Sequence, residues 1–218
     1  MNYQIDAPGS AIRTTVKLPA SKSISNRALI LNALSYSAYD VENLSDCDDT
    51  NLMVKALNSN DRDFNVGAAG TTMRFLTAFL SKVVGEWTIT GTERMKNRPI
   101  KVLVDALNAL GARIEYMEKE GYPPLRIFGS ALQGGEISLP GNVSSQYISA
   151  ILMIAPLTEN GVTLHLEGAI ISRPYIHITL QLMEQYGVRA SWTENTIKVL
   201  PQAVSYTHLR AHETVLDL

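Results

Sequence analysis

Apolar residues recur at intervals of three and four in six segments of the chain, which is the spacing of one buried helix face. The pattern predicts helices over residues 23–34, 51–57, within 67–80, 98–111, 147–157 and 173–187. Residues 147–157 are apolar on almost every side, so this helix is expected to be buried all round. Pro99 and Gly111 suit the start and the end of the fourth helix, and Asp48 or Asp49 is expected to cap the second.

Strand signals lie between these helices as short runs bounded by glycine, proline or asparagine. Predicted strands cover residues 12–18, 41–44, 87–90, 113–117, 125–128, 164–166, 189–192 and 196–200. Residues 113–117 and 125–128 are expected to form a hairpin through a Gly-Tyr-Pro-Pro turn. Residues 189–192 and 196–200 are expected to form a second hairpin around Glu-Asn. Helices and strands together predict a mixed α/β domain.

The order of the predicted elements repeats along the chain. Thr71 and Ser145, at the start of equivalent helices, lie 74 positions apart, and Arg98 and Arg173 lie 75 positions apart. The repeated unit is a strand, a helix, a strand, a helix and a hairpin. Ser23 precedes Thr71 by only 48 positions, so the first copy is expected to be shorter, with its closing hairpin reduced or missing.

Each copy begins its first helix after a turn rich in serine, threonine or glycine. A helix start offers unpaired N–H groups and the positive end of the helix dipole, which suits an anion. In the first copy, Lys22, Ser23 and Arg27 add two cations and a hydroxyl. On this stretch alone, an ordinary capped helix with two solvated cations is the simpler explanation. Three such helix starts directed at one place would instead form a site for a polyanion.

Composition excludes several classes of protein. Hydrophobic residues make up 45% of the 218 and charged residues 18%, so a sizeable core is expected. A formal net charge of −2 gives no general attraction to nucleic acid or acidic membranes. The sequence contains neither a signal-peptide pattern nor an apolar run long enough for a membrane span, so we expect a cytoplasmic protein.

Cys47 is the single cysteine, which excludes an intrachain disulfide and a cysteine metal cluster. The three aspartates beside it are expected to keep the pKa of its thiol high and the thiol unreactive. His208 and His212 have helical spacing but no third ligand placed with them, so they make a weak metal signal.

Six longer stretches carry a more specific resemblance, and they occur in this order between about residues 18 and 200: LPASKSISNRA, GAAGTTMR, ERMKNRPI, GYPPLRI, GNVSSQYISAILMIAPL and ISRPYI. They resemble the 5-enolpyruvylshikimate-3-phosphate synthases, also called 3-phosphoshikimate 1-carboxyvinyltransferases. The resemblance implies a transferase of the shikimate pathway, which leads to chorismate and the aromatic amino acids. Such enzymes move the enolpyruvyl group of phosphoenolpyruvate to the 5-hydroxyl of shikimate 3-phosphate, need no metal or organic cofactor, and are the target of glyphosate.

The matching motifs carry the family's site residues over to this chain. Those expected to bind shikimate 3-phosphate are Lys22, Ser23, Arg27, Ser144, Ser145, Gln146, Ser172 and Tyr175. Those expected to bind phosphoenolpyruvate are Lys22, Gly70, Thr71, Arg74, Arg98 and Gln146. Lys22 is also a candidate catalytic residue, whereas the resemblance implies that the main acid and base groups come from a part of the family's chain that has no match here.

Two positions depart from the family's pattern. The family often has Asn where this chain has Ala68, and Pro where it has Phe75. Both flank the phosphoenolpyruvate loop, so affinity for that substrate and for glyphosate stays open. The retained Gly70 and Thr71 favour a site of ordinary shape.

The resemblance also implies the architecture, which is one half of the two-domain enolpyruvyl transferase fold. Three βαβαββ-like units would surround a pseudo-threefold axis, with helices inside and sheets outside. Residues 1–17 are expected to form an arm that crosses to the other domain, 18–202 the substrate-binding domain, and 203–218 a non-native tail from a gene fragment. The C-terminal domain would be the natural partner. Without its acid and base groups and without domain closure, the chain alone is expected to be inactive.

Two alternatives compete with this function. The related enolpyruvyl transferase that acts on UDP-N-acetylglucosamine shares the repeated fold. However, the motifs SKSISNR, SSQ and SRPY fit a small phosphorylated substrate, and Cys47 does not lie where the reactive cysteine of that enzyme is expected. A noncatalytic scaffold built on the repeat is the other alternative, and it predicts no affinity for anions.

Overall fold

Residues 9, 11, 13 and 15–205 are described by the structure, which is a computed structural model. The helices are α1 (Lys22–Leu34), α2 (Asp48–Leu57), α3 (Gly70–Lys82), α4 (Glu93–Lys96), α5 (Lys101–Ala109), α6 (Ser145–Ile154), the 3-10 turn η1 (Ala155–Leu157) and α7 (Arg173–Gln185). The strands are β1 (Asp63–Asn65), β2 (Gly85–Thr90), β3 (Arg113–Tyr116), β4 (Leu125–Gly129), β5 (Gly135–Pro140), β6 (Val162–Glu167), β7 (Ala190–Thr193) and β8 (Thr196–Val199).

Two four-stranded sheets have the same topology, in the orders β1-β2-β4-β3 and β5-β6-β8-β7. In each sheet the first two strands are parallel and are joined through a helix, α3 or α6. The last two strands of each sheet form an antiparallel hairpin, as predicted. The predicted βαβαββ unit is therefore confirmed in two copies, with the short helix α4 added in the first of them.

The first repeat consists of α1 and α2 and has no strand among the residues that the structure describes. The strand predicted over 41–44 is absent, because Asn43 adopts a positive φ of 52°, which interrupts an extended segment. The strand predicted over 12–18 lies partly outside the described residues. Its described part, which includes Val16 and Leu18 at 70% and 80% exposure, pairs with no strand. An extended segment without a neighbouring ladder cannot satisfy its backbone groups as a sheet.

Three helix starts differ from the pattern. Helix α1 begins one residue early, because Ser21 caps it by accepting a 3.5 Å hydrogen bond from the backbone N of Ile24. Helix α2 begins at Asp48 with Cys47 at the N-cap, so the predicted aspartate cap is wrong. Helix α5 begins at Lys101 rather than near Pro99, because the chain first turns through α4.

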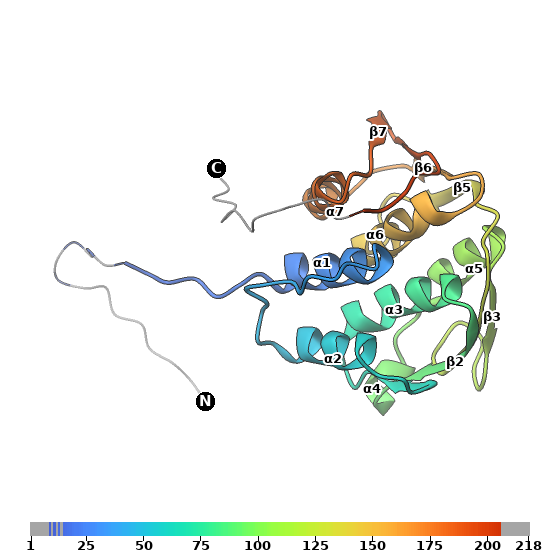
Figure 1. Ribbon diagram of the computed structural model, residues 1–218, viewed down its shortest axis with the longest axis horizontal. Helices are drawn as coiled ribbons and strands as arrows, with labels where there is room; N and C mark the ends of the chain where they lie inside the picture. Colours follow the sequence, from blue (N-terminus) through green and yellow to red (C-terminus); the bar gives the residue numbers. More distant parts are fainter. Residues whose placement is uncertain (1–8, 10, 12, 14, 206–218) are drawn as a thin grey trace.

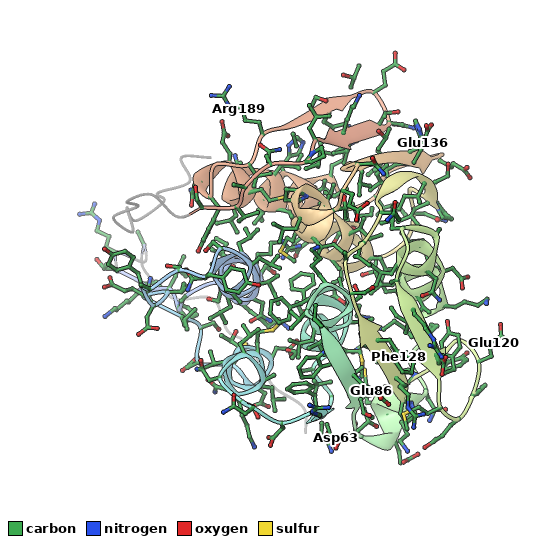
Figure 2. All side chains as sticks on the ribbon, turned by 45° about the vertical axis from the view of Figure 1, so that its right-hand side comes forward. Asp63, Glu86, Glu120, Phe128, Glu136 and Arg189 are labelled. Carbon is green, nitrogen blue, oxygen red and sulfur yellow. The ribbon has the colours of Figure 1, made fainter. Side chains whose placement is uncertain are left out.

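Helices α3 and α6 form the interior and the sheets form two outer layers, while α2 and α7 lie at the surface and bury few of their residues (Figure 1). Every residue of α6 except Gln146 is buried, as the all-round apolar pattern predicts. The strands cover this interior with one face. In β5, Ile137 and Leu139 are buried while Glu136 is exposed, and Figure 2 shows Glu136 and Arg189 at the outer surface. Within the described part of the chain, no helix combines the length and apolar content that crossing a bilayer requires.

Candidate anion-binding site

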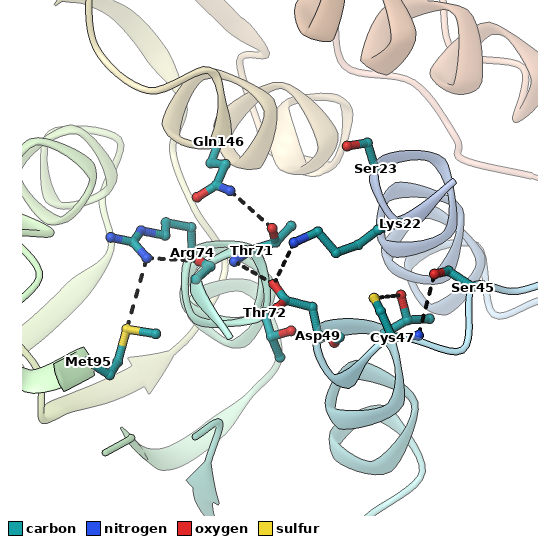
Figure 3. A network of polar contacts seen from close by, with 12 residues as sticks. Lys22, Ser23, Ser45, Cys47, Asp49, Thr71, Thr72, Arg74, Met95 and Gln146 are labelled. Carbon is teal, nitrogen blue, oxygen red and sulfur yellow. Dashed lines mark hydrogen bonds and ion pairs between the residues drawn. The ribbon is translucent and has the colours of Figure 1, made fainter. Parts of the chain in front are cut away.

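A chain of polar contacts connects the first turns of α1, α3 and α6 (Figure 3). Lys22 Nζ lies 3.6 Å from Asp49 Oδ1. The same oxygen accepts a hydrogen bond from the backbone N of Thr71 at 3.3 Å. Gln146 Nε2 in turn donates to Thr71 Oγ1 at 3.0 Å. The structure thus brings together one predicted site residue from each of the three repeats.

Asp49 belongs to this network although no sequence motif singled it out. Ala69 at the N-cap of α3 has no side-chain oxygen, so helix α3 cannot cap itself. Asp49 supplies the missing acceptor from α2, and its backbone carbonyl also accepts from Thr72 Oγ1 at 2.7 Å. Asp49 and Thr71 are 22 positions apart in the sequence, so local spacing gives no signal of this contact.

Gly70 lies directly against two guanidinium groups. A Cβ atom at this position would lie 2.8 Å from Arg98 Nη2 and 2.9 Å from Arg74 Nη1, both too close for real atoms. Arg74 is 4% exposed and donates to the carbonyl oxygens of Gly70 and Pro99 at 3.0 and 3.3 Å. A side chain at position 70 would therefore require the Arg98 and Arg74 guanidinium groups to move.

The two cations beside Gly70 are not neutralised. Within the described residues, neither Arg74 nor Arg98 forms an ion pair with a carboxylate. Burial lowers the pKa of Arg74, and the neighbouring Arg98 lowers it further, while Tyr147 and Asp49 act in the opposite direction. Arg74 Nε is buried and has no hydrogen-bond partner among the described residues. Such an excess of positive charge favours an anion in the adjacent space.

The first turns of α6 and α7 present hydroxyl groups. Ser144 caps α6 by accepting from the backbone N of Gln146 at 3.3 Å, and Ser145 is 8% exposed. Ser172 occupies the N-cap of α7 without making a side-chain cap bond, and Tyr175 is 46% exposed. Within the described chain, neither of the last two side chains is hydrogen-bonded to another predicted site residue, so α7 is the least connected of the four helix starts.

Arg27 and Ser23, both in α1, are the remaining residues predicted to bind shikimate 3-phosphate. Ser23 is partly exposed in the first turn of α1, whereas Arg27 is 2% exposed and lies one turn deeper. The guanidinium of Arg27 is directed at protein oxygen atoms of α1, α6 and α7, among them the hydroxyls of Ser149 and Thr179. Sequence motifs did not single out either hydroxyl. Their position four residues after Ser145 and Tyr175 is the one signal that could have found them.

The thiol of Cys47 contradicts the sequence prediction. Burial raises the pKa of Cys47, but hydrogen bonds with Ser45 and Thr50 and the nearby Lys22 ammonium lower it by more, so the pKa lies below its usual value. None of the three flanking aspartates is among the causes of this shift, and the carboxylate of Asp49 accepts a hydrogen bond from the backbone N of Thr71.

The two departures from the family's pattern have different surroundings. Phe75 is fully buried, and its ring centre lies 5.3 Å from the Arg27 guanidinium carbon. Ala68 is exposed and lines an open hollow of about 510 Å³ beside the first turn of α2.

Comparisons with known proteins decide the family. A family model described as EPSP synthase (3-phosphoshikimate 1-carboxyvinyltransferase) matches residues 7–59 and 58–212. The chain belongs to the EPSP synthase family. It is 60% identical over 203 residues to a 3-phosphoshikimate 1-carboxyvinyltransferase of Bacteroides fragilis strain YCH46, a match that covers 93% of this chain and 49% of that protein. A protein with the same name from Vibrio atlanticus is 42% identical over 226 residues, covering 92% and 53%.

Solved structures agree on the fold. An EPSP synthase from Acinetobacter baumannii superimposes with a TM-score of 0.77 at 20% identity, and the match covers 88% of this chain and 48% of that one. The chain therefore has the fold of one half of an EPSP synthase and spans about half the length of the curated relatives it matches.

Proposed function

We propose that this chain is the shikimate 3-phosphate-binding half of a cytoplasmic 3-phosphoshikimate 1-carboxyvinyltransferase. The observation that carries the proposal is the contact between the first turns of α1, α3 and α6, linked through Asp49, next to arginines that have no carboxylate partner among the described residues. Helix starts supply N–H donors, and unpaired guanidinium groups supply charge, so together they suit a ligand with several anionic groups.

The proposal divides the site between the two substrates. Lys22, Ser23, Ser144 and Ser145 would donate hydrogen bonds to shikimate 3-phosphate, with Ser172 and Tyr175 approaching it from α7. The motifs also predict Arg27 as a ligand, but it is 2% exposed and all three of its nitrogens donate to protein oxygen atoms, so we place it behind these residues. The Lys22 ammonium suits a phosphate because its side chain is 47% exposed and can turn toward a ligand. Gln146, whose amide nitrogen is bonded to Thr71, would offer its carbonyl oxygen to a ligand hydroxyl.

Phosphoenolpyruvate would lie near Gly70, because the absence of a Cβ lets the guanidinium groups of Arg98 and Arg74 come close to the start of α3, where they can meet an anion. Arg98 has a planar guanidinium group that matches a carboxylate or phosphate. Arg74, which donates to the backbone carbonyl of Gly70, would support the loop beside it. Thr71 would connect this part of the site to Gln146. Lys22, whose ammonium lies 3.6 Å from Asp49 Oδ1, would be between the two ligands, in keeping with its candidate role at the reacting groups.

Enolpyruvyl transfer also needs acid and base groups beside the reacting atoms. Addition of the 5-hydroxyl to the double bond of phosphoenolpyruvate requires one group to remove the hydroxyl proton and another to protonate the methylene carbon; the resulting methyl group must then lose a proton as phosphate leaves, which restores the double bond. Asp49 is held by Lys22 and by Thr71, so it is occupied as an acceptor rather than placed as a base. We therefore propose that the 218-residue chain binds shikimate 3-phosphate weakly and does not turn over alone.

Calorimetry with shikimate 3-phosphate tests the proposal. Measurable heat with the ligand, no heat with UDP-N-acetylglucosamine and no enolpyruvyl transfer by the purified chain are the expected results. Absence of heat at millimolar shikimate 3-phosphate would favour the scaffold, and heat with the nucleotide sugar alone would favour the related transferase. Enolpyruvyl transfer by the chain alone would contradict the claim that it is inactive.

A further inference from the structure

A buried guanidinium connects three helices one turn below the proposed site. Arg27 of α1 is 2% exposed. Its Nε donates to Thr179 Oγ1 of α7 at 2.7 Å, and its Nη2 donates to Ser149 Oγ of α6 at 2.9 Å. Its Nη1 donates to the backbone carbonyl of Ser23 at 2.8 Å. One cation therefore holds α1, α6 and α7 together.

The charge of Arg27 has no counter-ion in the part of the chain that the structure describes. Its three partners are neutral oxygen atoms, and the ring of Phe75 closes another side. Burying a charge without an opposite charge is costly, and burial lowers the pKa of Arg27 to about 10. The group nevertheless remains protonated at neutral pH, so a positive charge is stored beneath the helix starts.

The hydroxyl groups around Arg27 form a directed network. Thr179 Oγ1 lies 2.9 Å from the backbone carbonyl of Tyr175 and 2.7 Å from Ser149 Oγ. A hydroxyl has one proton to donate and can accept two hydrogen bonds, and a carbonyl can only accept. Thr179 therefore donates to Tyr175 and accepts from Ser149, while both hydroxyls accept from Arg27. In this arrangement Thr179 has no hydrogen-bonding capacity left over.

The network lies in register with the proposed ligand residues. Arg27 follows Ser23, Ser149 follows Ser145, and Thr179 follows Tyr175, each by four positions. Side chains four residues apart lie on the same helix face, one turn from each other. The cation and its two hydroxyl partners thus form a second layer directly below the three residues that would meet the substrate.

We propose that Ser149 and Thr179 are positioning residues, which hold Arg27 and thereby fix the first turns of α1, α6 and α7 around one anion. This inference rests on the proposed function, because Ser23, Ser145 and Tyr175 are expected shikimate 3-phosphate ligands. The uncompensated charge favours binding of an anion above it, and the hydroxyls keep that charge in place.

The test uses Thr179→Val, which keeps the shape of the side chain but removes the acceptor of both Arg27 Nε and the Ser149 hydroxyl proton, while Ser149 Oγ still accepts from Arg27 Nη2. Thr179→Ser retains the hydroxyl. Thr77→Val is the matched control, because Thr77 is also fully buried on a helix and donates to a carbonyl four residues earlier, Met73 at 2.7 Å, without touching Arg27. Shikimate 3-phosphate binding is measured by calorimetry, and the Arg27 Nε–H signal by nitrogen-15 NMR.

We expect Thr179→Val to weaken binding about tenfold or more, as loss of hydrogen bonds to a charged group implies. The Nε–H signal should shift or disappear in this variant, and Thr179→Ser should restore both readouts. Thr77→Val should bind like the unaltered chain. Unchanged binding by Thr179→Val, or equal weakening by Thr77→Val, would overturn the positioning role. If the unaltered chain itself gives no heat, the proposed function fails and the positioning role fails with it, which is a distinguishable result.

Discussion

Asp49 caps a helix to which it does not belong: its Oδ1 accepts a hydrogen bond from the backbone N of Thr71 at 3.3 Å. The same oxygen lies 3.6 Å from Lys22 Nζ. A single carboxylate from α2 therefore contacts the starts of both α1 and α3. Because Gln146 donates to Thr71, the same chain of contacts reaches α6 as well.

Replacing Asp49 tests this cap. Asp49→Ala should lower the free energy of unfolding by about 1 kcal/mol, the usual value of a helix cap. Asp49→Asn should lose less, because an amide oxygen can still accept from Thr71. Urea unfolding measures both variants. Asp48→Ala is the matched control, since Asp48 is an exposed residue of the same helix turn, and an equal loss there would show that the cross-helix bond has no special role.

Gly70→Ala should disturb the two arginines with little effect on the overall fold. The added methyl would overlap the guanidinium groups of Arg98 and Arg74, so Arg98 must move away from the helix start. We expect binding of phosphoenolpyruvate, measured with shikimate 3-phosphate present, to fall at least about tenfold, because a charge-assisted hydrogen bond is lost. Circular dichroism should remain unchanged. Equal phosphoenolpyruvate affinity in both proteins would contradict the placement of the substrate beside Gly70.

The Cys47 thiol should react at a lower pH than a thiol in an unfolded chain. Hydrogen bonds from Ser45 and Thr50, together with the Lys22 ammonium, favour its thiolate more than burial disfavours it. The rate of alkylation against pH should therefore have its midpoint below that of the same protein in denaturant. A midpoint at or above the denatured value would restore the prediction made from the neighbouring aspartates.

Tyr116 gives a prediction for alkaline pH. Burial raises the pKa of its phenol to about 12 from an ordinary value near 10, and its hydroxyl has no hydrogen-bond partner in the described chain. The folded protein therefore keeps a proton that the unfolded chain loses between these pH values, and stability falls with rising pH in this window. Tyr116→Phe should reduce that fall and raise stability by up to about 1 kcal/mol, since an unpaired hydroxyl is removed. Urea unfolding at pH 8 and pH 11 measures both effects, and an unaltered pH dependence would contradict the assignment.

The local parts of the fold could be predicted from the sequence. Helix periodicity located all the long helices, and the hairpins β3–β4 and β7–β8 followed from turns flanked by strand-forming residues. Strands β1 and β5 were missed, because β1 has three residues with one buried side chain and β5 begins with glycine. Both depend on parallel partners more than 20 residues away, Ile89 for Phe64 and Leu164 for Ile137, and local pattern carries no information about such pairing.

Some residues of the candidate site could likewise be predicted from the sequence, and others could not. Lys22, Gly70 and Gln146 lie in motifs that mark helix starts, so they could be singled out from the sequence. Asp49 could not be singled out as a site residue, because its role depends on which helix packs opposite it. Thr179 had one signal, its position four residues after Tyr175, but nothing in the sequence shows that it contacts Arg27. The pKa of Cys47 was predicted with the wrong sign for the same reason, since the groups that face the thiol matter more than its neighbours along the chain.

A backbone-amide NMR titration of the nitrogen-15-labelled chain with shikimate 3-phosphate tests the central claim most directly. Binding at the joined helix starts predicts saturable shifts concentrated in the first turns of α1, α3, α6 and α7, including Ser23, Thr71 and Ser145. Resonances of the outer sheets should remain in place. Shifts centred elsewhere, such as the hairpin β3–β4, or no shifts at millimolar ligand, would contradict the account.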